Sequence, residues 1–169
     1  ARLTQSVMMQ GALLPLELMA SLGSLGVEFQ LLEDAIDDHL ASIGHDVAQY
    51  SMGKKTKLFK RYAVDSGDKN LIWVSGKVDE VRLFRNKLFH AGFAGFLMTP
   101  LALYVGSSIE EAEVVQKADM DRCFIRMHGL AGLLGWYLTK QLKRNSLQVS
   151  SLEACWESAD PTRWSEILK

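Results

Sequence analysis

The sequence contains few of the residues that stabilise small secreted domains. Only two cysteines occur among 169 residues, Cys123 and Cys155, and two cannot build a disulfide framework or a cysteine-rich metal cluster. Both are interpreted as packing residues, because a nucleophilic cysteine needs a neighbouring base and a lowered pKa. A reducing compartment is therefore the default, and the protein is predicted to be cytoplasmic.

The sequence also lacks a long apolar run. Its longest uncharged stretch, residues 91–109, is interrupted by three glycines and Pro100, whereas a membrane-spanning helix needs about 20 predominantly apolar residues. The first 19 residues have no basic leader region and are interrupted by polar side chains, so a signal peptide is not expected. No association with a membrane is predicted.

Residue patterns typical of metal sites and phosphate loops are missing too. Helical bundles that hold two metals use Glu-x-x-His pairs, but none of the four histidines follows an acid at that spacing. No Walker-type or dinucleotide-type glycine loop is present, so neither a metal nor a cofactor is expected. His39 and His128 adjoin apolar stripes and are expected to be structural. A run of acids is interpreted as a solvated helix face: Glu33, Asp34, Asp37 and Asp38.

The composition that is present, 48% hydrophobic and 23% charged, predicts one globular domain over residues 1–169. The net charge of −1 hides a strong asymmetry. Residues 28–50 carry six acids and no lysine or arginine, whereas residues 51–90 carry ten bases and four acids. This segregation can be neutralised within the fold or across a dimer, or it can meet a polyanion.

Apolar residues spaced by three and four predict several long helices. The first stripe runs from Leu18 to Ile43 with Gly44 as its stop, and a short basic helix follows over about residues 54–64. Gly67 and Asp68 then predict a helix end and the N-cap of the next helix. The stripe of that next helix has six members: Leu71, Val74, Val78, Val81, Arg85 and Leu88.

The second half of the sequence predicts strands and then helices. Segments 101–105 and 113–116 favour a short hairpin, and a third long helix is expected from residue 119 or 121 to residue 144. Two short helices should close the chain, one with a capping box of Ser150 and Glu153 and one with Asp160 before Pro161. The predicted fold class is therefore all-α, a bundle of about four to five helices with a short insertion near residues 91–118.

The predicted basic helix carries a cluster that could bind RNA: Lys54, Lys55, Lys57, Lys60 and Arg61. Several bases on one surface can neutralise phosphates without a defined geometry. The alternative is a solvated helix that faces the acids of residues 28–50, and the sequence does not choose between the two.

Arg85 occupies a position on its stripe where an aliphatic residue is expected, and a buried charge needs a partner. Asn86 follows it directly, and His90 follows after four intervening residues. This RNKLFH segment resembles the arginine–histidine motif of the HEPN superfamily. The upstream GHDVAQY segment, residues 44–50, is similar to a Gly-His-Asp stretch of many members. The resemblance covers roughly residues 16–92, and loosely the last long helix, and it implies a HEPN-like helical bundle.

The same resemblance implies a metal-independent endoribonuclease that acts on RNA as a homodimer, in defence or stress response, with an antitoxin-like or other protein as a further partner. Its catalytic residues would be Arg85 for the phosphate, Asn86 for positioning and His90 as general acid or base. The apolar stripe around Arg85 would face the partner subunit. The alternative is a non-catalytic HEPN-like module that binds RNA or protein, or acts as a sensor.

Overall fold

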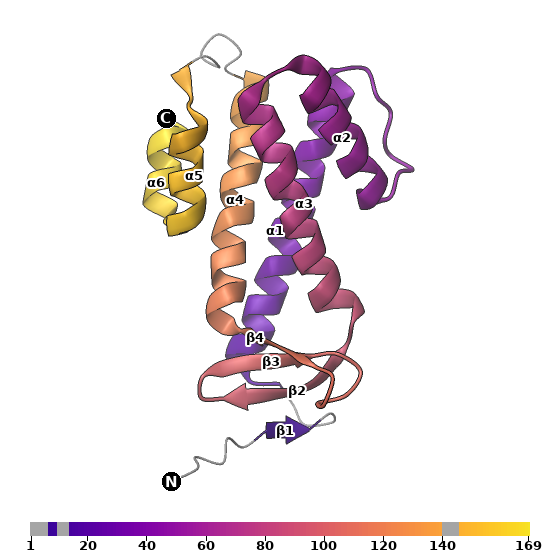
Figure 1. Cartoon of the computed structure of the whole chain (residues 1–169), viewed down its shortest axis with the longest axis vertical. Coiled ribbons are helices and arrows are strands. Elements are labelled where there is room, and N and C mark those ends of the chain that lie inside the picture. The colour runs from indigo at the N-terminus through magenta and orange to yellow at the C-terminus, as the bar shows by residue number, and fades with distance from the viewer. Residues whose placement is uncertain (1–6, 10–13, 140–145) are drawn as a thin grey trace.

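The computed structural model describes residues 7–9, 14–139 and 146–169. Within these residues six helices run along one axis and a small sheet lies at one end of the bundle (Figure 1). The elements are β1 (Val7–Met9), α1 (Leu16–Ser42), α2 (Met52–Ser66), α3 (Lys69–His90), β2 (Phe93–Met98), β3 (Leu101–Val105), β4 (Glu113–Gln116), α4 (Lys117–Thr139), α5 (Val149–Ser158) and α6 (Pro161–Ile167). The fold is therefore mostly helical, as predicted, but with more helices than the four to five expected.

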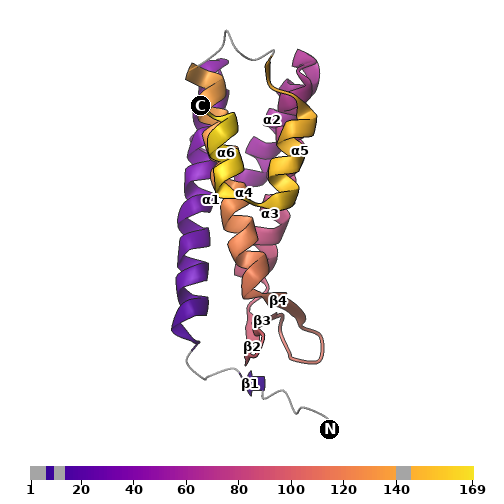
Figure 2. The ribbon, with the colours of Figure 1, turned by 90° about the vertical axis from the view of Figure 1, so that its left-hand side faces the viewer.

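α1 and α4 pack closely against each other and lie side by side in both views (Figures 1 and 2). The stripe predicted for the first helix is buried along α1, where Leu18, Leu32 and Ile36 are fully inaccessible. Burial of each such side chain contributes about 1.5–3 kcal/mol, so this stripe holds α1 against its neighbours. The predicted stop is confirmed: α1 ends at Ser42, and Gly44 has a φ of +90°, which glycine adopts without strain.

α2 and α3 form an antiparallel hairpin whose ends match the predicted caps. Gly67 closes α2 with a φ of +68°, and the Asp68 side chain accepts hydrogen bonds from the backbone N–H groups of Asn70 and Leu71. α2 has 15 residues and α3 has 22. The last two turns of α3 therefore extend past the beginning of α2, toward the sheet (Figure 1).

The sheet is larger than the predicted hairpin. β3 and β4 pair antiparallel with the predicted bounds, but β2 and β1 extend the sheet in the order β1-β2-β3-β4. The four residues from Ala94 to Leu97 in β2 are all buried, so this strand lacks the alternation that marks a half-buried strand. β1 pairs with β2 across about 90 residues of sequence, with Val7 opposite Leu97. Neither β1 nor β2 therefore has a local sequence pattern that predicts a strand.

The C-terminal helices pack against the outside of the bundle. Asp160 caps α6 by accepting a hydrogen bond from the Thr162 N–H, with Pro161 in the first turn, as predicted. The predicted capping box is wrong, because Gln148 is the N-cap of α5 and makes no side-chain cap bond. Glu153 instead accepts a hydrogen bond from the indole N–H of Trp73 and so joins α5 to α3. The predicted helix end at residue 144 lies outside the described residues.

Both cysteines are buried free thiols, which confirms their packing role. Burial raises the pKa of Cys123 to about 12, although the nearby charge of Arg126 acts in the opposite direction. No helix in the described ranges has both the length and the apolar character needed to cross a membrane.

Candidate functional site

The RNKLFH segment occupies the last two turns of α3, immediately before the sheet. The stripe that precedes it is buried inside its own chain, with Val78, Val81 and Leu88 no more than 3% exposed. The expectation that this stripe faces a partner subunit is therefore wrong. Arg85 itself is half-buried, whereas His90 is exposed.

Arg85 finds its partner within the chain. The carbon at the centre of its guanidinium lies 4.8 Å from the centroid of the Phe29 ring on α1. A planar guanidinium stacks well on an aromatic face and is less strongly hydrated than an ammonium. This contact explains how an arginine can occupy a stripe position, because the ring of Phe29 covers one side of the charge.

The guanidinium of Arg85 also contacts the other two motif residues, Asn86 and His90. Its Nη1 lies 3.1 Å from His90 Nε2 and 3.5 Å from Asn86 Oδ1. Arginine has donors only, so the histidine contact requires an unprotonated Nε2 that accepts. The contact is thus a hydrogen bond only for the tautomer that carries its proton on Nδ1. Among the described residues, no acceptor pairs with Nη2 or Nε of Arg85, so both donors remain available to an external acceptor.

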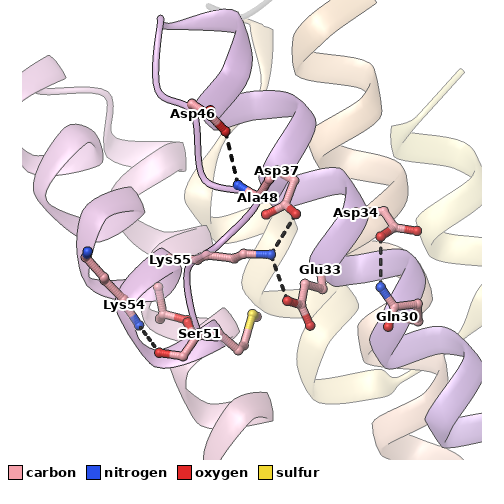
Figure 3. Close-up of polar contacts among 11 residues, drawn as sticks. Gln30, Glu33, Asp34, Asp37, Asp46, Ala48, Ser51, Lys54 and Lys55 are labelled. Carbon is pink, nitrogen blue, oxygen red and sulfur yellow. Dashed lines mark hydrogen bonds and ion pairs between the residues drawn. The ribbon is translucent and has the colours of Figure 1, made fainter.

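The predicted basic cluster is divided between two faces of α2. Lys54, Lys57, Lys60 and Arg61 are exposed, as an RNA-binding surface requires. Lys55 is buried, and its Nζ lies 2.8 Å from Glu33 Oε1 and 2.7 Å from Asp37 Oδ2 on α1 (Figure 3). Lys55 is therefore not available to RNA, and its prediction as an RNA-binding residue is corrected to a structural ion pair.

The ion pair of Lys55 also corrects the interpretation of the acids on α1. Burial by itself lowers the pKa of Lys55, but its hydrogen bonds and charge interactions with Asp37 and Glu33 outweigh that effect and raise it. Glu33 and Asp37 are partly buried, whereas Asp34 and Asp38 are exposed as a solvated face requires. Part of the charge asymmetry is thus neutralised within the fold.

A groove of about 630 Å³ lies between α2 and α3 on the side away from this ion pair. It is lined by Ser51, Gly53, Lys54, Thr56, Lys57, Lys60, Asp79 and Arg82. Arg82 pairs with Asp79, at 2.8 Å from Nη2 to Oδ1. Sequence reasoning missed Arg82, although it lies four and eight residues before Asn86 and His90 and therefore shares their helix face.

Of the two histidines predicted to be structural, His39 is buried and His128 is exposed. His39 is buried against the ring edges of Phe59 and Tyr62. His128 Nδ1 lies 3.1 Å from Glu28 Oε1, although its own side chain is mostly exposed. No three His, Cys, Asp or Glu side chains come together to hold a metal ion in the parts of the chain that the structure describes.

No family model matches the chain, and no curated protein or solved structure was found to be similar to it. A function must therefore be inferred from the geometry and chemistry of its own residues.

Proposed function

We propose that the chain is a HEPN-type, metal-independent endoribonuclease that acts on RNA as a homodimer. The observation that supports this most directly is the 3.1 Å separation between Arg85 Nη1 and His90 Nε2, at a surface where His90 is exposed. A permanent cation beside an unprotonated imidazole is a pair that can bind a phosphodiester and take up a proton next to it.

In the proposed reaction His90 Nε2 accepts the proton of a ribose 2′-hydroxyl while that oxygen attacks the adjacent phosphorus. Arg85 donates hydrogen bonds to the non-bridging phosphate oxygens and stabilises their growing charge. The bond from phosphorus to the 5′-oxygen breaks, and this oxygen leaves with a proton from a second, protonated histidine. The products are a 2′,3′-cyclic phosphate and a 5′-hydroxyl.

The binding of a phosphate must first change the Arg85–His90 contact, because Arg85 occupies the Nε2 lone pair in the free chain. A phosphate oxygen is a stronger acceptor for a guanidinium than a neutral imidazole, since it is charged. The substrate itself would thus draw Arg85 away and free Nε2 as a base. Asn86, whose Oδ1 lies 3.5 Å from Arg85 Nη1 in the free chain, would donate from its Nδ2 to the same phosphate.

A second copy would supply the second histidine. Two large apolar side chains near the motif support such an interface, since Leu83 is 56% exposed and Phe89 is 41% exposed. Exposed apolar groups beside polar residues are typical of interface surfaces. An interface with two-fold symmetry repeats one patch, so it would bring two motifs together if its axis passes near them.

The second candidate function is a non-catalytic HEPN-like module that binds RNA or protein. The stacking of Arg85 on Phe29 favours it, because an arginine that already has a partner within its own chain can serve as a structural residue. The chemical test below separates this alternative from the nuclease.

The test is cleavage of single-stranded and structured RNA in excess chelator, with His90→Ala and Arg85→Ala beside the parent protein. His45→Ala is the matched control, because His45 is exposed in the loop between α1 and α2. General acid–base catalysis contributes about 10²–10⁴ in rate, so we expect His90→Ala to lose that much while the control keeps full activity. Cleavage should leave cyclic phosphate ends and spare DNA.

Three results would count against the nuclease. Cleavage that survives both motif substitutions would assign the activity to another site or to a contaminant. Cleavage stopped by the chelator would exclude the proposed mechanism. A folded dimer that cleaves no RNA would favour the non-catalytic module.

A further inference from the structure

The groove between α2 and α3 reaches Arg82, which lies eight residues before His90 on α3. Because α2 and α3 run antiparallel, the first turn of α2 is level with Arg82, and α3 continues for eight more residues to His90. At 1.5 Å per residue this distance is about 12 Å along the helix axis. Lys57 and Lys60 lie on the following turns of α2, farther from His90 and on the same groove.

Three lysines of α2 line the groove together with Arg82 of α3: Lys54, Lys57 and Lys60. Asn86 and His90 continue from Arg82 at spacings of four along α3 and so extend this set of polar groups into one row. Lys60 on α2 lies beside the part of α3 that is about 15 positions before His90. At the helical rise of about 1.5 Å per residue, the row from Lys60 to His90 is therefore about 22 Å long. It is therefore much longer than a single phosphate needs.

The charge of the groove suits a polyanion. Four of the groove's side chains are cations and one, Asp79, is an acid that Arg82 already neutralises. Two acids of α1, Glu33 and Asp37, do not oppose this charge at the groove, because they pair with Lys55 (Figure 3). Lys55 and the groove lysines thus divide the basic helix into a structural face and a binding face.

We propose that this groove binds the phosphate backbone of single-stranded RNA that extends for several nucleotides to one side of the cleaved bond. This inference rests on the proposed nuclease function and specifies single-stranded RNA as its substrate. Lysines neutralise phosphates without reading bases, so the binding is independent of sequence. A single strand fits the chemistry because its backbone can rotate to put the 2′-oxygen in line with the leaving oxygen.

Phosphate binding does not require the 2′-hydroxyl, which only the cleavage step uses. Single-stranded DNA should therefore occupy the groove as RNA does, remain uncleaved and inhibit RNA cleavage competitively. This separates the two proposals experimentally, because DNA binding reports on the groove whether or not the chain cleaves RNA.

The test compares two triple variants of equal charge. The groove variant is Lys54→Gln, Lys57→Gln and Lys60→Gln, and the control is Lys69→Gln, Arg122→Gln and Arg163→Gln, three exposed bases that do not line the groove. Binding of oligothymidylates of about 4, 8 and 16 nucleotides is measured by fluorescence anisotropy over a range of salt concentrations. Circular dichroism checks that both variants fold.

We expect affinity to rise with length in the parent and in the control, and to rise little in the groove variant. Each single-strand phosphate contact contributes about 0.7 to the slope of log affinity against log salt, so the groove variant should lose about 2 from that slope. The KM for long RNA should rise in the groove variant and the rate at saturation should change little.

Several outcomes would overturn the inference. Equal losses in both triple variants would show that net charge acts and the groove does not. Unchanged DNA binding in the groove variant would exclude the groove even if the parent cleaves RNA. Polyglutamate that binds the groove as tightly as the oligonucleotides would exclude a nucleic-acid site. By contrast, length-dependent binding in a parent that cleaves nothing would refute the nuclease and support the groove.

Discussion

Arg85 Nη1 and His90 Nε2 lie 3.1 Å apart although the two residues are separated by five positions on one helix. Side chains on a helix surface normally meet at spacings of three or four. The contact at five depends on the length of the arginine and on the support of Phe29, which lies under the guanidinium. The pair is therefore arranged by tertiary packing as well as by the helix.

Arg85→Lys tests whether the planar guanidinium matters or only its charge. A lysine cannot form the two-pronged phosphate contact and stacks less well on Phe29, so we expect RNA cleavage to fall roughly tenfold or more with the charge retained. Arg85→Ala should fall further. Single-turnover cleavage rates measure both, and a fully active lysine variant would show that a point charge is enough.

Phe89→Glu should disrupt the proposed dimer without unfolding the chain. Phe89 is 41% exposed, so a charge there costs little in the monomer but much in an apolar interface. Light scattering at micromolar concentration should change from dimer to monomer, and RNA cleavage should be lost with it. Val64→Glu is the control, since Val64 is also exposed but lies at the far end of α2. A parent that is monomeric would refute the dimer directly.

The helices and several caps could be predicted because their signals are local. Gly67 and Asp68 mark the end of one helix and the beginning of the next by their own conformational and hydrogen-bonding preferences. The β2 strand had no such signal, since its centre is buried without alternation, and β1 depends on a partner about 90 residues away.

For the candidate site, the sequence gives the spacing of the motif residues but not the contacts that they make. The motif spacing marks Arg85 and His90, whereas the partner that supports Arg85, Phe29, lies 56 positions earlier in the sequence. By contrast, the sequence does contain a pattern that separates Lys55 from the exposed bases of α2. Lys55 precedes Phe59 and Ala63 at spacings of four, and all three lie on the buried face of α2.

Lys55→Met should destabilise the fold, because it leaves Glu33 and Asp37 without their cation. Removal of one partner from a fully buried pair costs about 3–5 kcal/mol, and both acids keep some exposure here, so about 1–3 kcal/mol is expected. Lys60→Met, at an exposed position, should stay within about 0.5 kcal/mol of the parent. Urea unfolding at neutral pH measures both, and an unchanged Lys55→Met would refute the stabilising role.

The stabilising effect of Lys55 on the fold should also depend on pH. The pKa of Lys55 is raised above the ordinary value of 10.5, so its ion pair stabilises the fold fully below that value. The contribution is lost as the pH rises through the raised pKa of the folded state. The difference in unfolding free energy between the parent and Lys55→Met should therefore be constant near neutrality and shrink above about pH 10.5.

The two thiols should react only when the chain unfolds. Burial raises the pKa of Cys123 to about 12 and also raises that of Cys155. At pH 8 only about one Cys123 in ten thousand is then the reactive thiolate. A chromogenic disulfide reagent should detect almost no thiol in the native protein and two per chain in denaturant. A fast native reaction would contradict the buried packing of these residues.

Gly129 on α4 is required by the docking of α6. A Cβ built at this position would lie 2.3 Å from the indole ring of Trp164, which is 2% exposed and held in the core. Gly129→Ala must therefore displace the tryptophan and α6 with it, and overpacking of this kind costs about 1–3 kcal/mol. Gly76→Ala on α3 is the control, since a Cβ there meets nothing within 4 Å. The control should gain up to about 1 kcal/mol from helix propensity. Thermal unfolding should move the two variants in opposite directions, and a Gly129→Ala protein as stable as the parent would mean that α6 does not pack on α4 through Trp164.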